Sequence, residues 1–471
     1  MTSPSSKRWT LAVVCLATAM LMLDIAVVNT ALSDIAAELH TGLSGLQWVV
    51  DAYTLALAST VLSAGFLADR FGRRRLFIGG LTLFTVASVV CAASGDIGML
   101  VAARAVQGLG AAILFAVALA LLGTAYPEPK ERAGAIAIWG ATIGGSFAVG
   151  PLVGGALTSG LGWQSIFLIN VPIGAIALAI TLRKVGESKD PFPRSLDVPG
   201  QIAIAGAMFL LVLGLLRGHE QGWGSTPIVA ELAGAAVLFI AFIAREHTAR
   251  EPMAPLHLFR MPVFLGTQLG VFAISASFFA IFLYTTLYLQ NVLGLSAVEA
   301  GLVYIPGTLM NFVVAGASAQ FIPKLKPQVP VAVGLAMVAV GMVLFTLADE
   351  HSSWTVILPG ELIALAGTGM VNTSLSGLAL SILPERDNGL ASGIHDMFRQ
   401  GGIAVGVAAL GVLIPTSGAL GGDAKAFVDG LHNALLAGAG LAFAGAIAAA
   451  FLIRPRTAAA RELGRLAPEP A

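Results

Sequence analysis

Fourteen apolar segments, each long enough to cross a lipid bilayer, restrict the fold of this chain more than any other feature. A span needs roughly twenty apolar residues to cross about 30 Å of hydrocarbon. Within hydrocarbon every backbone polar group must be hydrogen bonded internally, so we expect each segment to be a helix. The sequence therefore predicts an all-α integral membrane protein, with spans near residues 9–31, 46–68, 75–95, 97–123, 133–157, 162–182, 196–217, 227–244, 262–290, 297–321, 328–348, 354–381, 388–413 and 430–453.

The composition excludes a soluble globular domain. Of the 471 residues, 57% are hydrophobic and only 11% are charged, and the mean hydropathy is +0.86. Lys plus Arg equals Asp plus Glu at 26 each, so no overall charge attracts nucleic acid and we expect no such partner. Cys15 and Cys91 lie in apolar runs without ligand-like neighbours, which favours helix packing over a redox or metal role.

The positions of the basic residues predict the topology. An even number of spans places both termini on one side, and most Lys and Arg residues fall in alternate connections or in the two tails, which the positive-inside rule assigns to the cytoplasm. The first apolar run follows Lys7 and Arg8, as in a signal peptide, but it is long and contains Asp24, so we expect a retained span. We predict a multi-pass protein of the cytoplasmic membrane with both termini cytoplasmic, and the Ala and Gly content favours a bacterial source.

A faint internal repeat predicts two halves. The segment from Gly65 to Arg75 is weakly matched by the segment from Gly316 to Lys326, and each follows the second span of a six-span half. Transporters built from such repeats enclose a central cavity. We therefore predict an N-terminal six-helix bundle at 1–182, an inserted helix pair with cytoplasmic linkers at 183–261, a C-terminal six-helix bundle at 262–453 and a cytoplasmic tail at 454–471.

The loop after the second predicted span, GFLADRFGRRR, is the sharpest local signal. Its first glycine permits close helix approach, its aspartate can pair with cations or cap a neighbouring helix, and its second glycine allows a tight turn. The loop resembles that of the major facilitator superfamily, where it is taken to latch the two halves together. A positive-inside signal alone would explain the arginines but not the Gly and Asp spacing. The resemblance implies a gating role for Gly65, Asp69, Arg70, Gly72 and Arg73.

Further segments narrow the resemblance to the fourteen-span drug/proton antiporter branch, whose fold has two six-helix bundles plus two additional central helices. The matching segments are LDIAVVNTAL (23–32), the string 100–112, GPLVGG (150–155), GWQSIFLINVPIG (162–174) and YLQNVLGLSAVEAG (288–301). Ser146 and Gln164 replace a usual glycine and a common arginine. The resemblance implies multidrug efflux, and hence antibiotic resistance, by proton antiport and alternating access.

The fifth predicted span carries small residues on one side and a proline in its middle. Such a helix packs closely and bends. We predict a hinge or a tight seal between the halves, with close packing alone as the alternative. The residues concerned are Gly150, Pro151, Gly154 and Gly155.

Three charged residues of the predicted N-terminal bundle lie at similar depth. A rise of 1.5 Å per residue places Asp24, Asp51 and Arg104 about 9, 7 and 10 Å below the outer face. An ionised carboxylate inside a bilayer is costly and is functional by default. A buried cluster of these groups that rearranges between two states could bind a proton outside and release it inside. The alternatives are a static ion pair that only holds helices together, and coupling to Na+ instead of H+.

A second set of residues is expected to bind the substrate. Glu361 lies about 10 Å below the outer face and could neutralise a cationic compound, unless it is merely hydrogen bonded to its neighbours. Asn29 and Gln107 belong to the matched motifs. An apolar cavity with one or two carboxylates would accept lipophilic molecules, especially cations. Candidates for its wall are Phe115, Trp139, Phe147, Phe278, Phe279, Tyr284, Tyr288 and Met310.

The eleventh span of the two bundles carries His395, Asp396 and Arg399 towards its cytoplasmic third. We interpret this group as an inner gate or a proton exit. A purely structural polar network is an equal alternative.

Other classes of protein fit the sequence less well. It contains no phosphate-binding loop, no HExxH and no clustered His/Cys site, so we expect no enzyme and no cofactor, and a proton gradient must drive transport. Two similar halves around few charges favour alternating access over a channel. We predict a monomeric proton-coupled antiporter that exports small amphipathic, lipophilic or cationic compounds. The alternatives are a dedicated exporter of one endogenous metabolite or lipid and, less favoured, a transport-dead membrane sensor.

Overall fold

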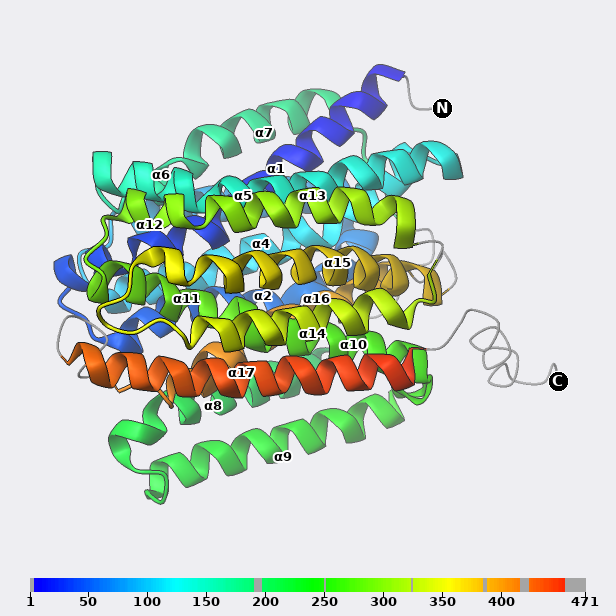
Figure 1. The fold of residues 1–471 in the computed structure, drawn as a ribbon. Helices are drawn as coiled ribbons and strands as arrows, with labels where there is room; N and C mark the ends of the chain where they lie inside the picture. Colours follow the sequence, from blue (N-terminus) through cyan, green and yellow to red (C-terminus); the bar gives the residue numbers. More distant parts are fainter. Residues whose placement is uncertain are drawn as a thin grey trace.

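The computed structural model describes residues 4–189, 197–249, 251–322, 325–383, 388–415 and 423–453. All regular elements in these ranges are helices, and most run along one common bundle axis (Figure 1). The N-terminal end of α1 (Pro4–Glu38) and the C-terminal end of α17 (Ala424–Leu452) lie at the same end of the bundle (Figure 1). This placement agrees with an even number of spans.

The first six expected spans form one group of packed helices. α1 packs against α5 and α7, while α2 and α3 both pack against α4. The sixth span is made of two consecutive helices, α6 and α7. The bounds are α2 (Leu43–Phe71), α3 (Arg73–Ala92), α4 (Ile97–Ala125), α5 (Pro129–Leu161), α6 (Ser165–Leu168) and α7 (Asn170–Lys184).

The last six expected spans form a second group, in which α14 packs against α15 and α17, and α13 against α15. Its first span is one continuous helical stretch. Along the chain, α10 is followed by the π-helical turn η2, and α11 by the π-helical turn η3. Its second span is interrupted at Tyr304, beside Pro306. The bounds are η1 (Leu256–Arg260), α10 (Pro262–Ile274), η2 (Ser275–Phe279), α11 (Ala280–Leu287), η3 (Tyr288–Val292), α12 (Ala297–Val303), α13 (Ile305–Phe321), α14 (Gln328–Phe345), η5 (Trp354–Val356), α15 (Leu358–Ile382) and α16 (Asn388–Gly411).

Every expected span coincides with a helix. In the described part of the chain, 11 helical stretches are long and apolar enough to cross a membrane. The remaining expected spans, near 46–68, 133–157 and 388–413, coincide with α2, α5 and α16. The all-α membrane fold is therefore confirmed. The division into domains at residues 182, 261 and 453 stays a prediction, and the expected tail at 454–471 lies outside the described residues.

The inserted pair, α8 (Val198–Gln221) and α9 (Thr226–Thr248), is a helical hairpin at the edge of the bundle (Figure 1). α8 packs against α2 and α16, one helix from each group, and the ring of Trp48 lies 5.9 Å from that of Phe209. α9 packs almost entirely on α8 and exposes apolar side chains, including Val237. The inserted pair therefore covers the seam between α2 and α16 on one side.

Two ion pairs hold this hairpin together. Arg245 Nε lies 2.8 Å from Asp197 Oδ1, and Arg217 pairs with Glu231. Each pair joins the two helices or their flanking residues. The charges of these four side chains are therefore compensated within the hairpin.

The two groups of helices, hereafter the two halves, meet along a seam between α2 and α16 and a second seam between α5 and α12–α13. Polar contacts cross between the halves near the end of the bundle where α1 ends. The Gln47 amide donates to the Tyr284 hydroxyl at 2.7 Å, and the Gln290 amide donates to the Thr30 carbonyl at 2.8 Å. The halves are therefore in close contact at the end that the basic residues assign to the outside.

Candidate functional site

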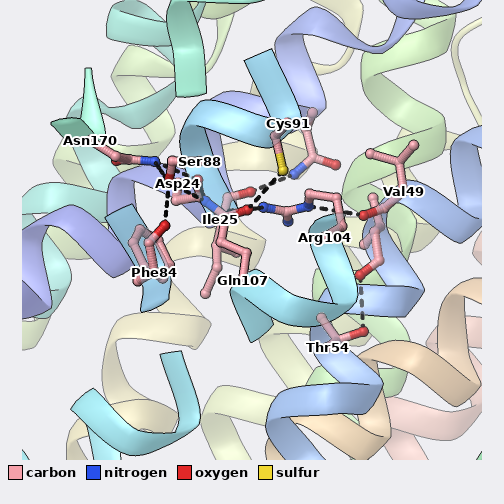
Figure 2. A network of polar contacts seen from close by, with 12 residues as sticks. Asp24, Ile25, Val49, Thr54, Phe84, Ser88, Cys91, Arg104, Gln107 and Asn170 are labelled. Atoms are coloured by element: carbon pink, nitrogen blue, oxygen red, sulfur yellow. Dashed lines mark hydrogen bonds and ion pairs between the residues drawn. The ribbon is translucent and has the colours of Figure 1, made fainter. Parts of the chain in front are cut away.

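A buried ion pair between α1 and α4 is the centre of the candidate site (Figure 2). The Oδ2 atom of Asp24 lies 2.5 Å from Nη1 of Arg104, and the Asp24 side chain is fully buried. Charge-assisted contacts of this length are strong. The two residues share a depth, as their sequence positions predicted.

Two amides complete the surroundings of Asp24. Gln107 and Asn170 each donate to its Oδ1 at 2.8 Å, and Gln107 also donates to Ser88 at 2.8 Å (Figure 2). Both carboxylate oxygens therefore accept hydrogen bonds from α4 and α7, an arrangement that suits the ionised form. Asn170 and Ser88 were not predicted, although a polar residue within an apolar span is a signal that could have found them.

Arg104 is held from several sides. Its Nε donates to the Val49 carbonyl of α2 at 3.1 Å, and its Nη1 donates to Gln107 Oε1 at 2.6 Å. The guanidinium carbon lies 4.3 Å from the centre of the Tyr53 ring and 5.7 Å from that of Phe167. Arginine stacks on aromatic faces in this way. The ion pair therefore connects α1, α2, α4 and the α6–α7 span.

Asp51 is equally buried but does not join this cluster. Neither oxygen of its carboxylate has a hydrogen-bond partner among the described residues. Residues four apart share a helix face, and Gln47, four residues before Asp51, contacts Tyr284 of the other half. The expected three-residue cluster is therefore an Asp24–Arg104 pair, with Asp51 on a separate face of α2.

A cavity, here called the central cavity, lies between the halves. Both halves contribute to it, since its wall comes from α1, α5, η2, α13, α15 and α16. The wall is mainly apolar, with one positive charge and several neutral polar groups. It is lined by Met22, Ile25, Ile143, Phe279, Thr308, Asn311, Leu365, Asn372, Arg399, Gln400 and Ile403.

A second cavity connects this region with the ion pair. It includes Arg104, Tyr53 and Asn29 in its wall and shares Ile25 and Phe279 with the central cavity. Asn29 was expected among the substrate-binding residues. The neighbouring cavities therefore extend from Arg399 of one half to Arg104 of the other.

The other expected substrate residues are divided among several places. Phe115 lies beside the central cavity, where its ring centre is 5.2 Å from the Arg399 guanidinium. Gln107 belongs to the Asp24 network. Tyr284 bridges the halves by accepting from the Gln47 amide, and it donates to the Val407 carbonyl within its own half. Tyr288 donates to the Asp349 carbonyl in the loop after α14, at 2.7 Å. Of these four, only Phe115 adjoins the central cavity.

Glu361 is buried in α15 and does not line either cavity. Its carboxylate lies against Gly307, just after the interruption between α12 and α13, where any added Cβ would meet it. Among the aromatic candidates Phe279 lines both cavities, Trp139 packs on Phe115 with ring centres 5.9 Å apart, and the Phe147 side chain lies outside the described part.

The loop between α2 and α3 is tied to the segment that follows α7. Gly72 has φ +110°, a conformation that favours glycine. The Glu187 carboxylate accepts from the backbone N–H groups of Arg74 and Arg75 at 3.1 and 3.3 Å, and Arg73 donates to Thr124 at 2.6 Å. A carboxylate at a helix N-terminus is favourable, so Glu187, which was not predicted, stabilises the loop.

Two further residues of the expected latch, Gly65 and Arg70, have described positions. Arg70 is exposed, and a Cβ added at Gly65 would lie 4.0 Å from Ala116. The Asp69 side chain lies outside the described part of the chain. The gating role of the loop stays a prediction.

The small residues of α5 lie at its contacts with α1 and with α12. A Cβ on Gly154 would be 2.8 Å from Val27 Cα of α1, and one on Gly155 would be 2.8 Å from Val298 Cα of α12. Gly150 faces Ala26 of α1, and the Pro151 carbonyl faces Gly301 of α12. This part of α5 therefore packs backbone to backbone against both halves.

In α16, Arg399 Nη2 lies 3.1 Å from Asp396 Oδ1, and both side chains are largely buried. His395 is buried as well, and its Nδ1 has no hydrogen-bond partner among the described residues. The three expected gating residues therefore lie together, and only Arg399 lines the central cavity.

Comparison with known proteins agrees with this architecture. The profile of the Major Facilitator Superfamily matches residues 14–407. The chain is 37% identical over 396 residues to the drug efflux pump JefA of Mycobacterium tuberculosis, covering 84% of this chain and 78% of JefA. It is 36% identical over 407 residues to the tetracenomycin C resistance and export protein of Streptomyces glaucescens, covering 86% and 75%.

A solved structure of a POT family transporter in complex with a thioalcohol-conjugated peptide shares the fold. Its TM-score is 0.67 at 13% identity, covering 93% of this chain and 94% of that one. The matches in sequence and in fold extend over most of the chain. This protein belongs to the Major Facilitator Superfamily.

Proposed function

We propose that this protein exports small amphipathic compounds in exchange for protons, by alternating access of the central cavity to the two sides of the membrane. The names of the relatives support export, since one is a drug efflux pump and another a resistance and export protein. The proposal places the chain in the cytoplasmic membrane with both termini cytoplasmic, as a monomer without enzymatic activity.

The observation that carries proton coupling is the buried Asp24–Arg104 pair at 2.5 Å, adjoining a cavity that both halves line. A fully compensated pair of this kind is costly to separate, because either charge alone would remain buried. Protonation of Asp24 removes that cost. Proton binding to Asp24 therefore favours a state in which Arg104 has separated from α1. Proton release favours the state in which the Asp24–Arg104 ion pair is formed.

Asp51 is a second candidate for the proton. Its carboxylate is buried in the seam helix α2 and has no hydrogen-bond partner among the described residues, a situation that the neutral form tolerates better than the ionised form. Because α2 packs against α16, a charge on Asp51 would act directly on the contact between the halves.

Transport measurements in proteoliposomes test the proposal. Three probes share one fluorophore and differ in charge: neutral dansylamide, cationic dansylcadaverine and anionic dansylglycine. Protein-free liposomes under the same pH gradient correct for passive distribution. We expect the wild type to export at least one probe in a gradient-dependent way, and Asp24→Asn to abolish that export while remaining folded in the membrane.

Asp349→Asn serves as the matched control, because Asp349 lies in an exposed loop, and it should transport like the wild type. Asp51→Asn separates the two carboxylates: loss of coupling in this variant as well would assign the proton to both. Export that ignores the pH gradient, or that persists in Asp24→Asn, contradicts proton coupling. Export driven by a Na+ gradient at constant pH would replace H+ by Na+.

A further inference from the structure

We infer that the central cavity selects amphipathic compounds that carry an anionic group, with Arg399 as the ligand of that group. The inference rests on the proposed export function and names the substrate class of the same site. It replaces the cationic substrates that the sequence favoured, because the charge exposed to the cavity is positive.

The charged side chains in the walls of the two cavities have one sign. Among the described residues, Arg399 is the only charged side chain that lines the central cavity, and Arg104 is the only one that lines its neighbour. The buried carboxylates lie elsewhere: Asp24 is bound by Arg104, Asp51 is on α2, and Glu361 lies against Gly307. A compound in the cavity therefore meets cations and no described carboxylate in the wall.

Arg399 has donors to offer. A guanidinium has five N–H donors, and the described contacts of Arg399 are the ion pair of Nη2 with Asp396 at 3.1 Å and the face of the Phe115 ring at 5.2 Å. Its Nη2 is buried and has no hydrogen bond to any described residue, and Asp396 does not line the cavity. The ring of Phe115 and the carboxylate of Asp396 orient the guanidinium, while other N–H groups remain for a ligand.

The rest of the wall suits an amphipathic anion. Asn311, Asn372 and Thr308 are neutral polar groups, and the Gln400 amide oxygen, beside Arg399 in sequence, is buried without a hydrogen-bond partner. An N–H or O–H group of the ligand, next to its anionic group, would donate a hydrogen bond to the Gln400 amide oxygen. Apolar side chains such as Leu365 would contact the hydrophobic body of the ligand.

A cation is disfavoured by the same geometry. Like charges repel strongly where water is excluded, and such repulsion is a common source of specificity. The aromatic face that would attract a cation, that of Phe115, is already occupied by Arg399. The cavity therefore combines attraction for an anion with repulsion of a cation of the same size.

Equilibrium binding to the full chain in phosphatidylcholine nanodiscs tests the inference without any gradient. The three dansyl probes are titrated, and the fluorescence gain in an apolar site reports binding. We expect dansylglycine to bind about tenfold more tightly than dansylcadaverine, with dansylamide between them, since one charge-assisted contact is worth about tenfold or more. This charge order needs no variant, so it holds whether or not a substituted chain folds.

Two substitutions assign the effect to Arg399. Arg399→Gln should weaken the binding of dansylglycine about tenfold and leave the binding of dansylamide nearly unchanged. Arg399→Lys should keep most of the preference for the anionic probe. The control is the double variant R217Q/E231Q, which removes another arginine and its partner from the inserted pair, and it should bind all three probes like the wild type.

Tighter binding of dansylcadaverine by the wild type, or equal weakening of all three probes by Arg399→Gln, would overturn the inference. Nanodiscs that contain phosphatidylglycerol identify the source of the anion. Weaker binding of dansylglycine in these nanodiscs would mean that an anionic lipid competes for the same site. Unchanged binding would mean that soluble anions are the ligands. Anion-selective binding without gradient-driven transport would remove the antiport proposal and leave this site intact, so the two failures are distinguishable.

Discussion

At the residue level, the interior contains carboxylates in different surroundings. Asp24 accepts from Arg104, Gln107 and Asn170, whereas Asp51, at a similar depth, has no partner among the described residues. Depth along a helix follows from residue number, because each residue adds a constant rise. The face of the helix that meets a neighbour depends on how the helices pack, so the sequence predicted the shared depth and not the separation of Asp51 from the pair.

Removing one partner of the buried pair should cost more stability than removing both. Arg104→Gln leaves the Asp24 carboxylate buried without its counter-charge, and we expect a loss of about 3–5 kcal/mol in the free energy of unfolding. The double variant D24N/R104Q should recover most of that loss. SDS titration of the purified protein measures both values. Equal stability of Arg104→Gln and the double variant would mean that the pair is not coupled in the folded protein.

At the level of elements, α5 is the helix whose sequence most directly predicted its packing. The small residues Gly154 and Gly155 lie against Val27 of α1 and Val298 of α12. Small residues allow backbones in a membrane to approach closely. The sequence predicted close packing and a hinge or seal between the halves, but only the structure identifies α1 and α12 as the helices that these glycines meet.

A larger side chain at this contact should disturb the seam between α5 and α12. In Gly155→Val the added atoms would overlap Val298 of α12, so the halves cannot close there and export should fall about tenfold or more. Gly160→Val on the same helix is the matched control, because a Cβ at Gly160 has nothing within 4 Å. Dansyl export in proteoliposomes measures both. Similar export by the two variants would show that the contact is not a seal.

The π-helical turn η2 is another element that the sequence did not reveal. It places Phe279 in the wall of both cavities, within a span that is mainly apolar. Such turns occur frequently at functional sites because they change the direction of side chains within a helix. Hydrophobic periodicity cannot show one, since the residues on either side of the turn are apolar too.

At the level of the whole molecule, the inserted pair contacts both halves. α8 packs against α2 through Gln201, which contacts Ser63, and against α16 through Met208, which faces Gly401. If the halves rock as rigid bodies, α8 can follow only one of them. The contacts with α2 and with α16 are both local, so either one can open while the other persists.

Disulfide cross-links test this rigid-body movement. A cysteine pair replacing Ser63 and Gln201 ties α8 to α2, and a pair replacing Met208 and Gly401 ties it to α16. We expect at least one single cross-link to allow export and both together to abolish it, with recovery after reduction. Export is measured in proteoliposomes from a chain whose Cys15 and Cys91 are replaced by serine. Full export by the doubly cross-linked protein would exclude movement along this seam.

The amino-acid sequence by itself determined the helices and their number, because a chain in hydrocarbon must satisfy its backbone hydrogen bonds locally. It also marked the charged residues within the spans as candidates for function, because a buried charge is costly there. The tertiary structure alone decided which charges meet. It paired Asp24 with Arg104, kept Asp51 apart, and placed Arg399 rather than Glu361 in the wall of the central cavity. The reason is physical: each of these contacts depends on the rotation of helices that are far apart in the chain, and that rotation follows from the packing of the whole bundle.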